Sequence, residues 1–156
     1  MPFAFDDRQL LAPGVHEATL DEIERCFAQF LRSDRRIRLF ETLKRFLNDL
    51  KQAIPGSSVI LDCSFVMSIV DEPGDIDLIV IVPPEFDLRV EMQPVQYNLI
   101  SKRRVRQEYR FDAIAVNRGS VGEQDWITFF SRVEVDWQIK FDRLANISKG
   151  LVKVQT

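Results

Sequence analysis

Two aspartates stand at the start of a wholly apolar stretch of the chain. Asp75 and Asp77 flank one isoleucine and lead into residues 78–82, which are only Leu, Ile and Val. Such a run is typical of a strand buried on both faces of a sheet. Alternate strand residues share a face, so the two carboxylates repel each other and lose hydration unless a cation lies between them. The pair therefore predicts a site for a divalent metal ion.

A third aspartate occurs farther along the chain. Asp112 lies within residues 109–116 (YRFDAIAV), a mostly apolar segment that we expect to be a strand. Upstream, a strand expected over residues 58–62 ends in a sharp turn at Cys63 and Ser64. The aspartate pair is thus bracketed by a turn of two small residues and by another acidic strand.

A basic cluster directly precedes the Asp112 strand. It contains Lys102, Arg103, Arg104 and Arg106, at the end of a helix that we expect over residues 95–108. Cations at the C-terminal end of a helix complement its dipole, which is one interpretation of the cluster. The other is that Arg103 and Arg104 hold the phosphates of a triphosphate or polynucleotide.

The elements that must position these residues can be inferred from capping and periodicity. A capping box over residues 19–22 predicts a first helix, and apolar residues at helical spacing predict a second from Ser33 to the stop at Pro55. We interpret the arginines and lysines of this second helix, Arg35 and Arg36 among them, as a solvated face. We also expect a helix over 123–133 and an edge strand over 150–155. Residues 135–139 alternate as in a strand, and the alternative is an extended segment along the surface.

Length and composition favour one domain. The chain has 156 residues, a formal net charge of −3 and a pI near 5.3, so as a whole it is no electrostatic match for nucleic acid, although local basic clusters leave that partner open. Cys26 and Cys63 lack the spacing of a zinc site or a disulfide framework. Without a signal peptide or a membrane-length apolar run, we expect a cytoplasmic protein that does not contact membranes.

The turn, the aspartate pair and the later aspartate together resemble the DNA polymerase beta-like nucleotidyltransferase superfamily. The spacing is especially similar to its small prokaryotic members, the minimal nucleotidyltransferases. The family pattern is a Gly followed by Gly or Ser, about ten further residues, two Asp flanking a hydrophobic residue, and a third carboxylate on a later strand. Cys63 and Ser64 stand at the first two positions, Asp75 and Asp77 at the pair, and Asp112 at the third carboxylate. The chain departs from the pattern at Cys63, where glycine would let the backbone approach phosphate closely.

The resemblance implies a role for each matching residue. Asp75 and Asp77 would hold Mg²⁺ or Mn²⁺, and Asp112 would complete a metal position and help activate the acceptor hydroxyl. The turn at Cys63 and Ser64 would hold the terminal phosphates of a nucleoside triphosphate.

The resemblance also implies the architecture. We expect an α+β fold with a nucleotidyltransferase-like mixed sheet, helices packed on one face and an N-terminal helical pair. The single domain, residues 1–156, would comprise an extended arm over 1–18, helices over 19–54, a catalytic-type core over 58–116, and a C-terminal helix and strands over 117–156.

Three functional hypotheses follow. The first is a metal-dependent nucleotidyltransferase that transfers a nucleoside monophosphate to a hydroxyl on protein, nucleic acid or a small molecule. The second, motivated by Cys63 and the small size, is a catalytically impaired nucleotidyltransferase-like protein that binds a partner, such as the antitoxin of a toxin-antitoxin pair. The third is a structural module whose aspartates form salt bridges with the arginines at 103, 104 and 106.

Overall fold

A mixed β-sheet organises the part of the chain that the structure describes. The computed structural model describes residues 3–7, 9–28, 33–62, 64–67, 70, 72–133 and 147–156; Cys63 and the strand expected over 135–139 lie outside these ranges. The strands are β1 (Gly14–Ala18), β2 (Ser58–Asp62), β3 (Asp77–Val82), β4 (Asp112–Asn117) and β5 (Gly150–Gln155), in the order β1-β5-β2-β3-β4. β1 pairs with β5, and β3 with β4, in parallel, whereas β2 is antiparallel to both β3 and β5. The expected α+β class with a mixed sheet is confirmed.

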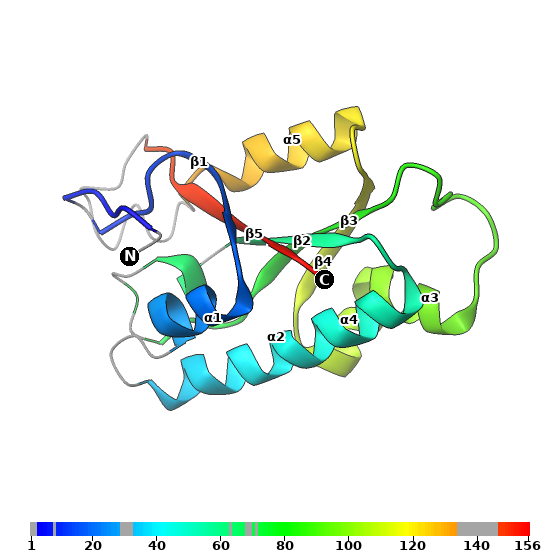
Figure 1. The fold of residues 1–156 in the computed structure, drawn as a ribbon, viewed down its shortest axis with the longest axis horizontal. Helices are drawn as coiled ribbons and strands as arrows, with labels where there is room; N and C mark the ends of the chain where they lie inside the picture. Colours follow the sequence, from blue (N-terminus) through cyan, green and yellow to red (C-terminus); the bar gives the residue numbers. More distant parts are fainter. Residues whose placement is uncertain are drawn as a thin grey trace.

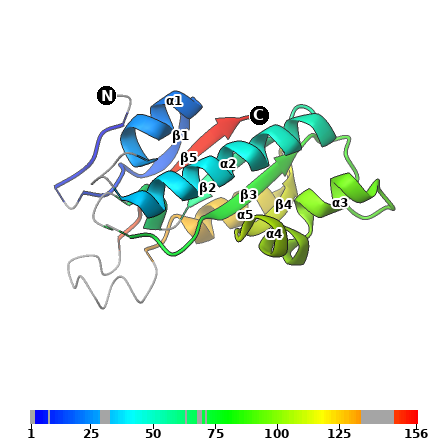
Figure 2. The ribbon, with the colours of Figure 1, turned by 90° about the horizontal axis from the view of Figure 1, so that it is seen from below.

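Helices cover both faces of this sheet. They are α1 (Leu20–Ile23), continued by a π-helical turn over Glu24–Ala28, α2 (Asp34–Ala53), α3 (Pro94–Ile100), α4 (Lys102–Tyr109) and α5 (Val121–Phe130). Figure 1 shows α5 above the sheet and α2 below it, and Figure 2 shows α2 lying along the strands. We expected helices on one face only. The second cover is needed because β2 and β3 are apolar on both sides, so both sides must be shielded from water.

The side chains of β3 show how the core divides. Leu78, Val80 and Val82 belong to the main core between the sheet and α2, while Ile79 and Ile81 pack with side chains of α5. All five are fully buried, as the apolar run predicted. The polar residue that begins β3, Asp77, has the same parity as Ile79 and therefore lies on the α5 face.

The N-terminal helices begin where local sequence predicted. Thr19 and Glu22 form both bonds of the capping box, and the Ser33 side chain accepts from the backbone amide of Arg36 to cap α2. The helical pair is therefore confirmed. Upstream of it, part of the expected extended arm is instead strand β1.

Two other expectations differ from the structure. The helix expected over 95–108 is two helices, because Ser101 has an extended backbone and its hydroxyl caps α4 by accepting from the amide of Arg104. The strand expected from Tyr109 begins only at Asp112, since Arg110 takes a left-handed conformation that ends α4. The segment 150–155 is a strand as expected, yet it lies between β1 and β2 and not at the edge of the sheet.

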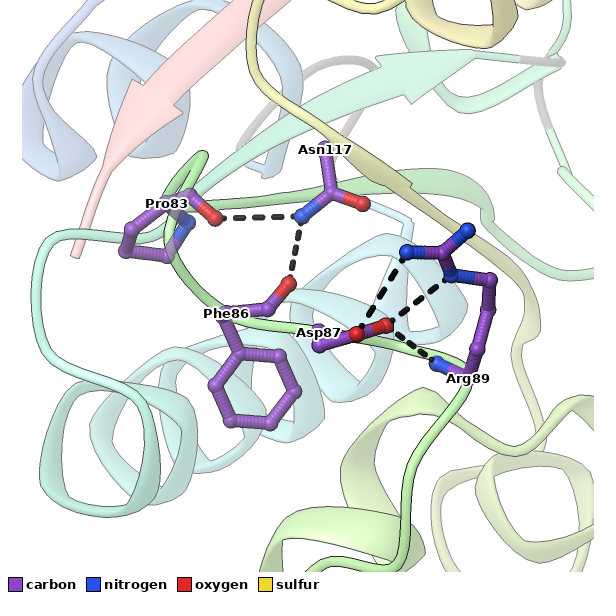
Figure 3. Close-up of polar contacts among 5 residues, drawn as sticks. All are labelled: Pro83, Phe86, Asp87, Arg89 and Asn117. Carbon is purple, nitrogen blue, oxygen red and sulfur yellow. Dashed lines mark hydrogen bonds and ion pairs between the residues drawn. The ribbon is translucent and has the colours of Figure 1, made fainter.

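Polar contacts fix the end of the sheet where β3 and β4 finish. Asn117 Nδ2 donates to the carbonyl oxygens of Pro83 at 3.1 Å and Phe86 at 2.6 Å, which anchors the loop between β3 and α3 (Figure 3). In the same loop the Asp87 carboxylate accepts from the Arg89 side chain and amide, and these bonds lower the pKa of Asp87. This loop is remote from the aspartates at the start of β3.

Within the described ranges, no helix combines the length and the apolar character needed to cross a membrane.

Candidate metal site

A row of aspartates crosses three neighbouring strands at one end of the sheet. Asp62 pairs with Asp77 in the antiparallel ladder, and Asp77 pairs with Asp112 in the parallel ladder. Directly paired residues project from the same face, so all three side chains lie on the α5 face. Asp62 is the last residue of β2, whereas Asp77 and Asp112 are the first residues of their strands.

Three carboxylates at this end converge closely enough to share a metal ion. Carboxylate oxygens of Asp75, Asp77 and Asp112 all lie within 4.8 Å of one another, and each residue is half-buried. We call these residues the carboxylate triad. Carboxylate oxygens are the hard ligands that Mg²⁺ and Mn²⁺ prefer, and the half-buried position leaves the oxygens accessible. The triad could therefore bind a metal ion, and the convergence predicted from sequence is confirmed.

The fourth aspartate of this region has a different environment. Asp62 is 2% exposed, and its Oδ1 lies 2.7 Å from the Nζ of Lys149, which is equally buried. Lys149 Nζ also donates to the carbonyl oxygens of Phe130, the last residue of α5, and of Arg132, at 2.7 and 2.9 Å. The ammonium thus compensates both Asp62 and the negative end of the α5 dipole. Asp62 is therefore a structural ion-pair partner beside the triad.

Two cations from α4 lie against the triad. Arg106 Nη1 is 2.8 Å from Asp75 Oδ2 and 3.7 Å from Asp112 Oδ2, and Lys102 Nζ is 4.0 Å from Asp112 Oδ1. The hydrogen bond with Asp75, together with the charge of Asp112, raises the pKa of Arg106. The Lys102 side chain is 67% exposed and the Arg106 side chain 52% exposed, so solvent weakens these attractions.

The two arginines predicted to bind phosphate are placed elsewhere. Arg104 Nε donates to Asn98 Oδ1 at 2.9 Å, and Arg104 lines a separate pocket of about 390 Å³ between α2, α3 and α4. Arg103 is exposed and follows Lys102 directly in α4, so its side chain points in a different direction around the helix. Lys102 and Arg106 share a face of α4 because they are four residues apart. The basic cluster does supply cations to the site, but through these two residues.

A pocket of about 460 Å³ surrounds the triad. Its lining comprises Asp75, Asp77, Lys102, Asp112, Ile114, Trp126, Phe129 and Phe130. The aromatic residues come from the last turns of α5, which follows β4 after a short turn and runs back over it. This return brings the C-terminal end of α5 over the beginning of β4, where Asp112 lies. The sequence predicts a helix over this region, but nothing in its pattern connects these aromatic residues with the aspartates.

Two adjacent arginines of α2 anchor the segment that leads into Asp75. The guanidinium of Arg36, fully buried, donates to backbone carbonyls of Phe27, Ser64, Phe65, Met67 and Val70. Arg35 donates to the carbonyls of Pro73 and Gly74. The interpretation of Arg36 as solvated is wrong. Its position four residues before Phe40, on the apolar face of the helix, was the signal in the sequence.

The phosphate-binding turn expected at Cys63 and Ser64 is described only in part. Ser64 begins a short 3-10 turn, Ser64–Val66, and is 4% exposed. Its backbone carbonyl accepts from Arg36 at 3.3 Å, and it lies outside the described lining of the carboxylate pocket. Cys63 is outside the described residues.

Nearly the whole chain matches one known protein family. A family model matches residues 3–155. The chain belongs to DUF6932, a family of unknown function. No curated protein matches it, and no solved structure does. For this DUF6932 member, the resemblance to nucleotidyltransferases rests on the sequence motif.

Proposed function

We propose that this DUF6932 member is a metal-dependent nucleotidyltransferase that moves a nucleoside monophosphate from a nucleoside triphosphate to a hydroxyl acceptor on protein, nucleic acid or a small molecule. The main supporting observation is the convergence of three carboxylates within 4.8 Å in a pocket that Lys102 also lines, with Arg106 against two of the carboxylates. A strand pair that begins with Asp77 and Asp112 side by side presents acidic oxygens to the same ligand.

The triad fits Mg²⁺ or Mn²⁺ by its donor set. A bound ion would offset phosphate charge and polarise the phosphoryl group that is transferred. Asp75, Asp77 and Asp112 would hold the ion, and Asp112 would also accept the proton of the acceptor hydroxyl. The hydroxyl oxygen then bonds to the α-phosphorus while the bond to the bridging oxygen breaks, and pyrophosphate leaves.

The cations on α4 suit the binding of the triphosphate. Lys102 and Arg106 lie at the edge of the triad, where their exposed side chains are free to turn toward phosphate oxygens. Arginine binds phosphate through two parallel N–H bonds, and lysine acts as a point charge. With substrate bound, Arg106 would exchange its carboxylate partners for phosphate oxygens.

A thermal-shift experiment tests this proposal without knowledge of the acceptor. Mg²⁺ together with a non-hydrolysable ATP analogue is expected to raise the melting temperature by about 5 °C or more at saturation. Asp77→Asn should abolish the shift. Asp87→Asn, which removes a carboxylate at the opposite end of β3, should keep it. If wild type shows no shift with any of the four analogues of ATP, GTP, CTP and UTP, the proposal is wrong.

A second candidate function is favoured by the ion pairs of Arg106. Its guanidinium already lies against Asp75 and Asp112, so protein cations neutralise part of the triad. This arrangement suits a nucleotidyltransferase-like protein that binds a partner, such as the antitoxin of a toxin-antitoxin pair. The test is co-expression with the product of a neighbouring gene. Neutralisation of that product that survives Asp75→Ala would show that catalysis is not required.

A further inference from the structure

The C-terminal half of α5 carries three aromatic side chains in mutual contact. The ring centroids of Trp126, Phe129 and Phe130 are 5.5 to 5.7 Å apart, two pairs edge-on and one tilted. Trp126 and Phe130 also pack on the apolar face of the sheet. We call these three residues the aromatic wall.

Phe129 differs from its two neighbours in the wall. Its side chain is 58% exposed, whereas Trp126 and Phe130 are partly buried against the sheet. Those two residues already cover the isoleucines of β3, so packing of the core does not account for Phe129. A single exposed phenylalanine is unremarkable on a surface, but this one lines the pocket that contains the carboxylate triad.

The lining of the pocket therefore combines two kinds of residue. Three carboxylates and Lys102 suit a metal ion and phosphates, whereas the aromatic wall and Ile114 suit a flat apolar ring. A ligand that uses both kinds of residue needs a polyanionic end and a planar aromatic end within one molecule. Nucleotides have this construction, and their bases stack on aromatic side chains with little dependence on the base.

We propose that the aromatic wall, with Phe129 outermost, stacks against the base of the nucleotide whose phosphates lie at the carboxylate triad. This assignment rests on the proposed function and adds the subsite for the base. Because every base presents a π-face, the wall accepts purines and pyrimidines alike, so selection among them is weak.

Calorimetric titration of the full chain in Mg²⁺ tests the subsite, with ATP, UTP and inorganic tripolyphosphate as probes. Tripolyphosphate has the phosphates and no base. Wild type should bind ATP on the order of tenfold more tightly than tripolyphosphate, with UTP close to ATP. Phe129→Ala should remove that advantage and leave the affinity for tripolyphosphate unchanged, and Phe129→Tyr should restore it.

Val121→Ala is the matched control, because Val121 is 77% exposed at the other end of α5 and lies outside the lining of the pocket. It should leave all affinities unchanged. Equal affinity of wild type for ATP and tripolyphosphate overturns the base subsite but leaves the proposed function intact. Equal weakening of both probes by Phe129→Ala also overturns it, since Phe129 would then act on the phosphate site. Failure of every probe to bind overturns both proposals.

Discussion

Arg106 Nη1 donates to Asp75 Oδ2 over 2.8 Å, so a cation of the protein itself lies against the carboxylates proposed to bind metal. The same nitrogen is 3.7 Å from Asp112. The guanidinium therefore relieves repulsion within the carboxylate triad when no other cation is bound. A metal ion must compete with it.

Arg106→Gln should consequently strengthen metal binding. Removing the competing charge is expected to raise Mn²⁺ affinity roughly two- to fivefold, a modest change because the pair is half-exposed. The melting temperature without metal should fall, since the carboxylates then repel each other. Arg103→Gln removes the same charge from the exposed face of α4 and is the control. Identical metal affinities in the two variants would show that Arg106 does not compete for the site.

Arg36→Met should destabilise the fold severely. The change leaves buried carbonyls, among them those of Phe27, Phe65 and Met67, without their donor. The free energy of unfolding, measured by urea denaturation, should therefore fall by about 3 kcal/mol or more. Arg36→Lys should recover only part of this, because an ammonium has fewer donors in a different geometry. Arg38→Met, on the exposed face of the same helix, should change stability by less than about 0.5 kcal/mol. Similar losses for Arg36→Met and Arg38→Met would contradict the anchoring role.

The buried pair of Asp62 and Lys149 should show strong coupling in a double-mutant cycle. Lys149→Met leaves a buried carboxylate uncompensated and should cost about 3–5 kcal/mol. Adding Asp62→Leu removes that charge, so the double variant should be more stable than Lys149→Met alone. Additive losses, measured by urea denaturation, would show that the two side chains do not interact.

Tyr109 should ionise only at strongly alkaline pH. Burial, and then the hydrogen bond that its hydroxyl donates to Asp49, raise its pKa above the ordinary value of about 10. Because the folded-state pKa is the higher one, this stabilisation is complete below pH about 10 and is lost as pH rises beyond it. The chain has two tyrosines, so Tyr97→Phe isolates Tyr109 for titration of absorbance at 295 nm. Titration of the folded variant at the same pH as the urea-denatured variant would contradict the prediction.

Features set by short-range rules could be predicted from the sequence. The capping box at Thr19, the cap at Ser33 and the bounds of β2 each depend on a few adjacent residues, and all three are confirmed. Strand parity was expected to place Asp75 and Asp77 on one face, but β3 begins only at Asp77, so Asp75 reaches the site from the segment before the strand. The convergence of Asp112 with them was predicted by resemblance to a known motif and not by any local rule.

Features set by long-range packing could not be predicted in the same way. The central position of β5 and the pairing of Lys149 with Asp62 depend on how the end of the chain returns to the sheet. Lys102 and Arg106 replace Arg103 and Arg104 at the site because the break at Ser101 sets which face of α4 is turned to the aspartates. When a helix ends within a segment that looks continuously amphipathic, the direction of every side chain after the break changes.

Mn²⁺ titration monitored by electron paramagnetic resonance tests the central claim most directly, because the signal of free Mn²⁺ falls as the ion binds. Wild type should bind at least one ion per chain. Mutation of a residue that only orients a metal ligand lowers metal affinity roughly 10- to 100-fold. Asp77→Asn removes a ligand itself and should lower Mn²⁺ affinity by at least that factor, while Asp87→Asn should bind Mn²⁺ as wild type does. Equal binding by wild type and Asp77→Asn, or no binding by wild type, would contradict the assignment of Asp75, Asp77 and Asp112 as a metal site.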